Sequence, residues 1–329
     1  MRRVLVSDVP FEKLDSNQYD WAIFGIGVES RCDFILKKMN AAGIKAKRIL
    51  VLAFPDFSLK LKSRFLVSAK RMGCEVVFQE QSSDSLDGID ALLERTIGSS
   101  DSSNVLIDYS VMSRIWYSAI LFWFYRNIKD CRSLKLSMVY ACGKYTKEIA
   151  SKKVSIKTIS AVPGCAGAVF RLTPTAVVFG LGFYGYASLC VSEQLEPDKI
   201  FTVSTIENPV RGFSVENQPG NKELISPAEK SFKIPLESVR AAYQCFMDVA
   251  MTCYARDEEV ILVPMGPKPH VLAATLASLS DRRICTLRVR HDQYLSDIAP
   301  SGKIIATRVS FVDTSSMATA RSSKSVRLG

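Results

Sequence analysis

Two stretches of the chain, 155 residues apart, share the pattern of an apolar strand, a Gly-x-Gly turn and a helix. Residues 22–27 read Ala-Ile-Phe-Gly-Ile-Gly, and residues 177–182 read Val-Val-Phe-Gly-Leu-Gly. A later strand recurs at the same offset, because Val105 lines up with Val260. Successive βαβ units resemble one another since they obey the same packing rules, but an equal offset at two motifs favours duplication. We therefore expect one α/β unit to be present twice.

Short apolar runs alternate with longer amphipathic stretches, which is typical of a mainly parallel sheet. The predicted fold class is α/β, with two tandem Rossmann-like parallel-sheet units related by internal duplication. For the first unit we expect strands at residues 21–27, 48–54, 74–79, 104–109 and 134–142, and helices at 29–42, 58–72, 84–98 and 112–128. For the second we expect strands at 175–181, 199–206, 231–236, 258–264 and 283–290, and helices at 184–195, 238–256 and 267–280.

Turn-forming residues mark the boundary between the two units, since residues 162–167 read Val-Pro-Gly-Cys-Ala-Gly. We expect unit 1 to span residues 1–165 and unit 2 residues 166–313, followed by a basic, flexible tail at 314–329. Residues 208–231 are expected to be irregular, with a surface flap at 217–221. A last strand at 303–312 is expected to close an edge of a sheet.

Composition restricts the compartment and the partners. The chain of 329 residues is 47% hydrophobic and 23% charged, which are ordinary globular values. Nine scattered cysteines without a CxxC motif indicate reduced thiols and a cytoplasmic location. Two histidines without metal-ligand spacing argue against a metal site, and the apolar helix near residues 115–125 is too short to span a membrane. The net charge of +10 favours nucleotides, nucleic acid or an acidic protein partner.

The Gly-x-Gly turn of the first unit is a candidate ligand site. Gly25 and Gly27 would allow a ligand to approach the backbone, and the helix that follows attracts anions. Glu29 could accept hydrogen bonds from ribose hydroxyls or act in catalysis, and Arg31 could reach a phosphate. The alternative is that the glycines only form a turn and that Glu29 complements the helix dipole. The third glycine of the dinucleotide fingerprint is replaced by Ser30.

The strand that ends at Asp108 leads into the most aromatic helix of the chain. A carboxylate at the carboxyl end of a strand lies where open α/β sheets bind ligands, so Asp108 is the candidate general base. Ser110 and Ser113 are candidates for capping the helix or binding a ligand. Arg114 falls in the first helical turn, where a cation opposes the dipole, and an anionic ligand would explain it.

The second unit offers candidates at the corresponding turns. Three prolines and a glycine around residues 264–269 fix a rigid loop from which a lysine projects, and a titratable histidine follows it. The alternative is that this loop is only a rigid turn with an exposed lysine. The candidate ligand-binding residues of this unit are Gly180, Gly182, Tyr184, Asn208, Arg211, Gly266, Lys268 and His270.

These features favour a nucleotide-binding protein with an asymmetric composite pocket between its two halves. In architecture alone, such a chain is similar to the ligand-sensing modules of prokaryotic antiviral systems of the CARF and SAVED type, although no motif is matched residue by residue. That similarity implies a ligand sensor or a subunit of such a system. The alternatives are an enzyme that uses Asp108 on a nucleotide or phosphoribosyl substrate, and a nucleic-acid-binding protein. The sequence identifies no cofactor.

Overall fold

The computed structural model describes most of the chain. The described residues are 2–14, 18–82, 86, 88–98, 104–127, 134–167, 173–207, 210, 212–292 and 297–313. The predicted tail at 314–329 and two candidate ligand residues, Asn208 and Arg211, lie outside them.

The described strands form two mixed sheets. The first sheet has the order β1-β13-β6-β5-β2-β3-β4, and the second has the order β10-β9-β8-β11-β12-β7. The first contains β1 (Arg2–Val9), β2 (Tyr19–Ile26), β3 (Ala46–Ala53), β4 (Glu75–Glu80), β5 (Asn104–Asp108), β6 (Lys135–Gly143) and β13 (Pro300–Asp313). The second contains β7 (Ile156–Ala161), β8 (Thr175–Gly180), β9 (Lys199–Thr205), β10 (Lys230–Ile234), β11 (Glu259–Pro264) and β12 (Cys285–His291).

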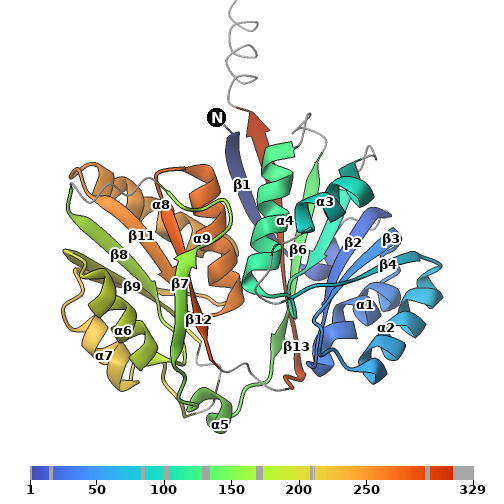
Figure 1. The fold of residues 1–329 in the computed structure, drawn as a ribbon, viewed down its shortest axis with the longest axis horizontal. Helices are drawn as coiled ribbons and strands as arrows, with labels where there is room; N and C mark the ends of the chain where they lie inside the picture. Colours follow the sequence, from blue (N-terminus) through green and yellow to red (C-terminus); the bar gives the residue numbers. More distant parts are fainter. Residues whose placement is uncertain are drawn as a thin grey trace, which may run out of the picture.

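The parallel strands of the two sheets follow the same order. In the first sheet, β2 lies in the middle, with β3 and then β4 on one side and β5 and then β6 on the other. Strands β8 to β12 repeat this arrangement in the second sheet (Figure 1). This order is the Rossmann-like one, so the structure confirms the predicted α/β class with two such units.

The two units exchange one strand each. Strand β7 follows β6 in the sequence but pairs antiparallel with β12 of the second sheet. Strand β13 follows β12 but pairs antiparallel with β6 of the first sheet. Each sheet therefore contains a strand from the far side of the predicted boundary at residue 165. The expected edge position of residues 303–312 is wrong, because β1 pairs along the outer side of β13 and takes the edge.

Helices cover both faces of each sheet (Figure 1). On the outer faces lie α1 (Phe34–Ala41) and α2 (Leu59–Met72) for the first sheet, and α6 (Gly185–Leu195) and α7 (Pro219–Ile225) for the second. Between the sheets lie α3 (Ile89–Leu93), α4 (Arg114–Asn127), α8 (Val239–Tyr254) and α9 (Lys268–Ser280). The short segments are η1 (Phe11–Lys13), η2 (Ser30–Asp33), η3 (Glu94–Gly98) and α5 (Lys147–Ala150). The prediction that residues 208–231 are irregular is wrong in part, because they contain helix α7. Pro219 suits the first turn of this helix.

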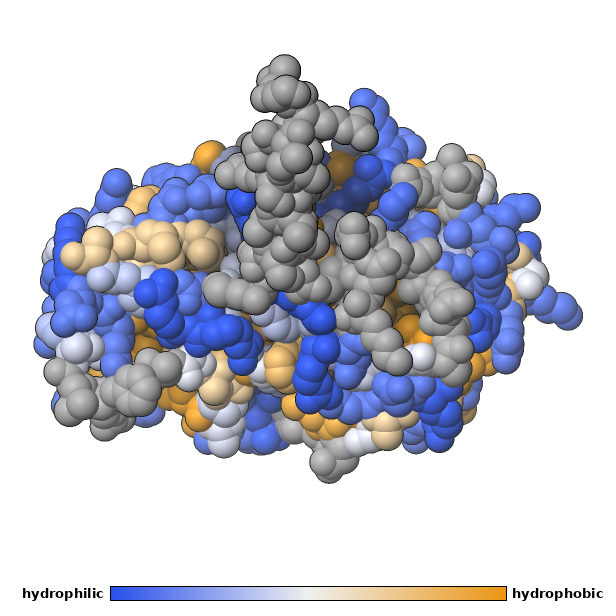
Figure 2. All heavy atoms as spheres, turned by 90° about the horizontal axis from the view of Figure 1, so that it is seen from above, coloured by the Kyte–Doolittle hydropathy of each residue, from blue (hydrophilic) through white to orange (hydrophobic). Residues whose placement is uncertain are grey.

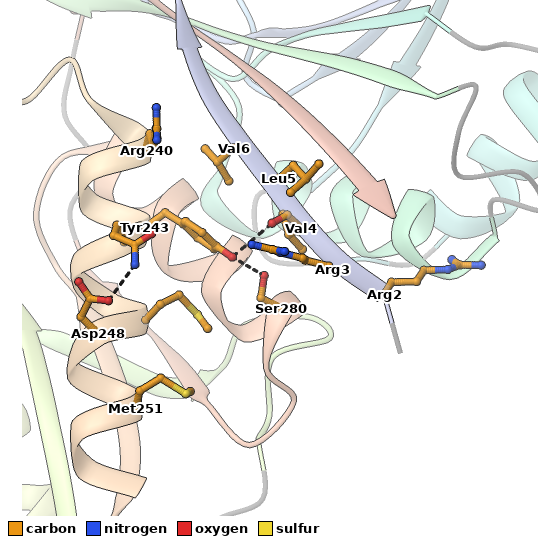
Figure 3. A pocket seen from close by; sticks show the side chains of 12 residues that line it. Arg2, Arg3, Val4, Leu5, Val6, Arg240, Tyr243, Asp248, Met251 and Ser280 are labelled. Carbon is orange, nitrogen blue, oxygen red and sulfur yellow. Dashed lines mark hydrogen bonds between the residues drawn. The ribbon is translucent and has the colours of Figure 1, made fainter. Parts of the chain in front are cut away.

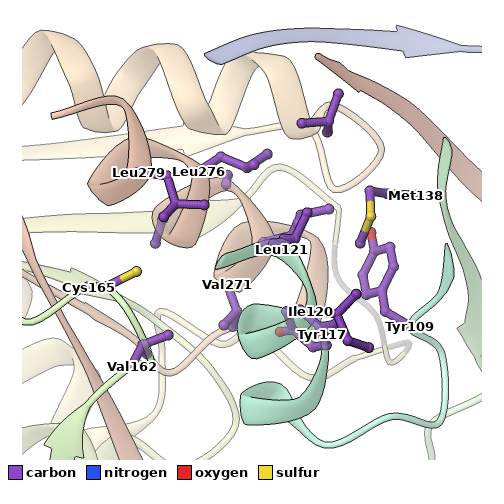
Figure 4. Packing of buried hydrophobic residues seen from close by; sticks show 14 of the residues in the cluster. Tyr109, Tyr117, Ile120, Leu121, Met138, Val162, Cys165, Val271, Leu276 and Leu279 are labelled. Carbon is purple, nitrogen blue, oxygen red and sulfur yellow. The ribbon is translucent and has the colours of Figure 1, made fainter. Parts of the chain in front are cut away.

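One hydrophobic core lies between the sheets and belongs to both units. Tyr117 and Leu121 of α4 are in the same cluster of buried side chains as Val271 and Leu276 of α9 (Figure 4). Apolar side chains cover α4 on nearly all sides because it is buried among the sheets and the other helices. This agrees with the interpretation of α4 as a core helix.

Within the described ranges, the helices all lack the combination of length and apolar character needed to cross a bilayer. Seen from above, the surface is mostly hydrophilic, with apolar residues in separate spots (Figure 2). The eight described cysteines are free thiols.

Candidate functional site

The loops after β5 and β11 meet where the two units join. In each sheet, the strands that follow the middle strand are first added on one side of it and then on the other. This reversal of strand order falls between the neighbouring strands β2 and β5 in the first unit and between β8 and β11 in the second. Ligands of open α/β sheets bind beside the carboxyl ends of the strands at such reversals. We call the surroundings of these two loops, 109–113 and 265–267, the junction.

A cation from each unit binds the loop of the other unit. Arg114 is the first residue of α4, and its guanidinium donates hydrogen bonds to the carbonyl oxygens of Pro264 (3.3 Å) and Gly266 (3.0 Å). Lys268 is the first residue of α9, and its Nζ donates to the carbonyl oxygens of Ser110 and Met112, both at 2.7 Å. A third acceptor for Lys268 is the Tyr109 carbonyl at 3.4 Å.

These contacts give the two cations a structural explanation. A positive charge at a helix N-terminus is unfavourable next to the dipole of its own helix. The carbonyl oxygens of the opposite loop compensate for it. An anionic ligand is therefore not required to explain Arg114 or Lys268. Arg114 nevertheless has five N–H donors, of which these two bonds use only part, and its side chain is half-buried.

The glycines of both turns allow close packing between neighbouring loops. A Cβ atom added to Gly25 would lie 2.8 Å from the backbone nitrogen of Met112. A Cβ atom on Gly266 would lie 2.8 Å from the carbonyl oxygen of Leu181, and one on Gly182 would collide with the carbonyl oxygen of Met265. Backbone atoms thus occupy the space that the missing side chains leave. The ligand-binding role of Gly25, Gly27, Gly180, Gly182 and Gly266 stays a prediction.

Asp108 is buried and holds the loop that follows β5. Its Oδ1 accepts hydrogen bonds from the backbone nitrogen of Ser110 (2.9 Å) and from the Ser110 hydroxyl. Ser110 Oγ in turn accepts a hydrogen bond from the backbone nitrogen of Ala141 at 2.7 Å, which ties the loop to β6. Burial raises the pKa of Asp108 to about 6, against the opposing effects of the Ser110 hydrogen bonds. The catalytic role of Asp108 stays a prediction.

Glu29 and Arg31 form an ion pair next to this loop. Arg31 Nε donates to Glu29 Oε2 at 2.6 Å, and the Arg31 side chain is almost completely buried. Its Nη1 donates to the carbonyl oxygen of Ala141 at 2.7 Å and to the hydroxyl of Tyr140 at 3.3 Å. Arg31 therefore faces the interior and fixes the direction of Glu29, which keeps part of its surface accessible.

Several charged groups surround Lys268. Burial lowers the pKa of Lys268 to about 7. The carboxylates of Glu29 and Asp108 raise this pKa, while the guanidiniums of Arg31 and Arg114 lower it. The junction thus gathers three cations and two carboxylates from both units.

Aromatic rings lie beside these charges. The rings of Tyr184 and His291 are 5.1 Å apart, and those of Tyr145 and Phe183 are 5.3 Å apart. Burial lowers the pKa of His291 to about 4, and the nearby Arg114 lowers it further. Burial also raises the pKa of Tyr184, against the effect of Arg114. Arg114, Tyr184 and His291 are therefore neighbours.

The structure brings most of the candidate residues together but not all of them. Ser113 accepts a hydrogen bond from the Trp116 nitrogen at 3.4 Å and so caps α4, as its position suggested. His270 lies in the core of the second unit, fully buried, where burial lowers its pKa to about 4. Sequence reasoning missed Tyr140, Tyr145 and His291. His291 ends a strand, which is the one signal in the sequence that could have identified it.

Among the described residues, no three His, Cys, Asp or Glu side chains are grouped as a metal site would require. No protein-family model and no curated protein matches the sequence.

Solved structures are similar to this chain only at low identity and low TM-score. One is a type III CRISPR defence DNA nuclease activated by cyclic oligoadenylate, at 8% identity and a TM-score of 0.46, with 79% of this chain and 64% of that chain covered. The match therefore spans less than two thirds of the nuclease chain. Another is the leucoanthocyanidin reductase of Vitis vinifera with NADPH, at 11% identity and a TM-score of 0.25, covering 79% of this chain and 86% of that one. A universal stress protein from Archaeoglobus fulgidus has 9% identity and a TM-score of 0.22, covering 82% and 96%. These neighbours carry no inference about what this chain binds.

Proposed function

We propose that the junction binds a nucleotide or another phosphorylated small molecule between the two units. The observation that carries this proposal is the half-buried Arg114 guanidinium, which keeps unused N–H donors at the strand reversal of both sheets, with Arg31 and Lys268 close behind it. Positive charge held by a rigid framework stabilises an anion without the cost of reorganising the site. The exposed part of Arg114 is the group that would contact the phosphate, because a guanidinium suits bidentate hydrogen bonding to phosphate oxygens.

The neighbours of Arg114 favour a nucleotide over a simple phosphate. Tyr184 and His291 are half-buried rings beside Arg114, and such rings can stack on a base. Glu29 is half-buried and has one carboxylate oxygen outside its bond to Arg31, which suits a ribose hydroxyl. The two sides of the proposed site come from different units, so the bound ligand would bridge them. Such a bridging ligand suits a sensor, in which ligand binding shifts the position of one half relative to the other.

Mass spectrometry of small molecules released from the purified protein is the first test. Calorimetric titrations with AMP, NAD⁺, a cyclic oligoadenylate and phosphate-free adenosine follow. We expect at least one of the phosphorylated compounds to bind, and to bind at least about tenfold more tightly than adenosine. Tyr184→Ala and His291→Ala should weaken binding about tenfold, since a stacked base contributes on the order of 1–3 kcal/mol. Tyr186→Ala, an exposed tyrosine on α6, is the matched control.

Each outcome of these titrations decides between the interpretations. Equal affinity for adenosine, or no binding of any of the compounds, would contradict the proposed anion site. A ligand recovered unchanged favours a sensor, including one that serves an antiviral system. Turnover of the ligand that disappears in Asp108→Asn favours the enzyme. Binding of DNA or RNA that falls steeply with salt, without any small-molecule binding, favours the nucleic-acid alternative.

A further inference from the structure

A second candidate site lies at the other end of α9, away from Lys268. It is a groove between strand β1 and helix α8, with a volume of about 530 Å³ (Figure 3). Ser280, the last residue of α9, lies at its wall. Since β1 belongs to the first sheet and α8 covers the second, both units contribute to this groove. The proposed junction site does not include any of its residues.

The walls of the groove are fixed by hydrogen bonds. The hydroxyl of Tyr243 on α8 donates to the carbonyl oxygen of Val4 at 3.3 Å and lies 2.7 Å from Ser280 Oγ (Figure 3). At the start of α8, Ser238 Oγ donates to Asp8 Oδ2 at 2.7 Å. Strand and helix are thereby connected at two points, so a ligand would enter a preformed groove.

The charge of the groove is positive. Arg3 and Arg240 are exposed, and neither forms an ion pair within the described part of the chain. Asp248 is the one acidic residue among those that line the groove, and its carboxylate already accepts a hydrogen bond from the Gln244 amide at 2.8 Å. Arg2 points away from the groove (Figure 3).

Apolar side chains form the rest of the lining. Val4, Val6 and Met247 line the groove together with Leu5, which is 41% exposed, and Met251, which is 42% exposed. Methionine side chains adapt to partners of different shape. The groove therefore combines an apolar surface with two exposed guanidiniums.

We propose that this groove binds an extended, acidic segment of a partner protein in which carboxylates alternate with apolar side chains. The distance along α8 from Arg240 to Met251 is about 16 Å at 1.5 Å per residue. About five residues of extended chain, at roughly 3.3 Å each, cover this length. The carboxylates of the segment pair with Arg3 and Arg240, and its apolar side chains pack on Met247 and Met251. Charge complementarity selects this occupant over a basic or neutral one.

Fluorescence anisotropy of labelled peptides tests the proposal with the full chain. The probe is a peptide of about six residues in which Leu and Glu alternate, compared with matched Leu–Gln and Leu–Lys peptides. The test variant is Arg3→Glu with Arg240→Glu. The control variant is Lys60→Glu with Arg71→Glu on α2, which makes the same change of charge at exposed positions away from the groove. Circular dichroism melts establish that both variants are folded.

We expect the Leu–Glu peptide to bind, and the test variant to lose at least about tenfold in affinity while the control loses less than about twofold. The test variant should also prefer the Leu–Lys peptide. Equal losses of affinity in both variants would mean that only the net charge of the protein matters, and this would overturn the proposal. It would also be overturned by a Leu–Gln peptide that binds as tightly as the Leu–Glu peptide, or by a Leu–Glu peptide that does not bind the unmodified chain. The nucleotide titrations above use different residues, so either proposal can fail alone.

Discussion

Arg114 and Lys268 hold each other's loops. Each is the first residue of a helix that follows the fourth parallel strand of its unit, and each donates hydrogen bonds to backbone carbonyl oxygens that precede the other helix. The exchange of strands is reciprocal in the same way, since β7 joins the second sheet and β13 joins the first. A chain whose two units are connected in this way needs both units to complete either one.

Replacing Lys268 tests the first of these connections. Lys268→Met keeps the length of the side chain but leaves the carbonyl oxygens of Ser110 and Met112 without their donor. We expect the free energy of unfolding to fall by about 2–4 kcal/mol, because buried acceptors without a partner are costly. Urea unfolding of the full chain measures this.

A double-mutant cycle of Lys268→Met with Arg114→Met measures how far the contributions of the two side chains to stability depend on each other. The sites share the same pair of loops, so we expect a coupling of about 1 kcal/mol or more. Strictly additive losses would mean that each cation holds its loop independently, which would contradict the reciprocal arrangement.

Sequence reasoning singled out Arg114 because a cation at the start of a helix indicates a compensating negative partner. It singled out Lys268 because a lysine on a rigid proline-rich loop suits a phosphate. The partners are backbone carbonyls from the other half of the chain, and a one-dimensional pattern does not show which distant loop supplies them. The role of His291 depends equally on tertiary neighbours, since only folding places it beside Tyr184 and Arg114.

The central strands β2, β5, β8 and β11 were predictable because buried parallel strands are apolar runs of the expected length. Strand β1 was not, since only Val4 of its eight residues is buried and polar pairs interrupt its short apolar run on both sides. The exchange of β7 and β13 left no signal either, because each strand pairs with a segment more than about 125 residues away. Helix α7 was hidden by the turn-forming residues Pro219 and Gly220 at its start.

The buried carboxyl group of Asp108 makes a pH-dependent contribution to stability. Its pKa rises from the ordinary value of 3.8 to about 6 in the folded chain, so the folded state holds the proton more tightly than the unfolded state. The stability that the protonated carboxyl group gives to the folded state is fully present below about pH 4 and is lost as the pH rises through about 6. A difference of two pKa units corresponds to roughly 3 kcal/mol, which we use as an order of magnitude.

Asp108→Asn removes this dependence while retaining an oxygen that accepts from Ser110. We therefore expect the free energy of unfolding of the variant to rise by about 2 kcal/mol relative to that of the unmodified chain as the pH goes from 4.5 to 7.5, measured by urea unfolding. Asp248→Asn, an exposed aspartate, provides the control. The same pH profile in Asp108→Asn and the unmodified chain would refute the assignment to Asp108.

Substitution of Gly25 tests whether the Gly-x-Gly turn needs its glycine for close packing against the neighbouring loop. An added methyl group at Gly25 would meet the backbone nitrogen of Met112 at 2.8 Å, and a backbone atom in a packed loop has little room to move. We expect Gly25→Ala to lower the free energy of unfolding by about 1–3 kcal/mol. Gly98→Ala is the control, because its new methyl group meets only the end of the flexible Glu94 side chain. Comparable losses at the two glycines would argue against the packing explanation.

The shared core predicts that the two units unfold together. The three tryptophans of the chain, Trp21, Trp116 and Trp123, all belong to the first unit, and their fluorescence reports on β2 and on the part of the core around α4. Far-ultraviolet circular dichroism reports on the helices and strands of both units. Because α4 packs on α9 in one core and each sheet borrows a strand, neither unit can unfold without exposing the core of the other.

We therefore expect the two signals to give the same midpoint and the same slope in urea, as coincident transitions indicate a single cooperative step. Tryptophan fluorescence that changes at a lower or higher urea concentration than circular dichroism would show that the units unfold separately. In that case, the strand exchange would be a connection between two independent domains and not a condition for their stability. Lys268→Met provides the internal comparison, because loss of a reciprocal contact should shift both signals by the same amount.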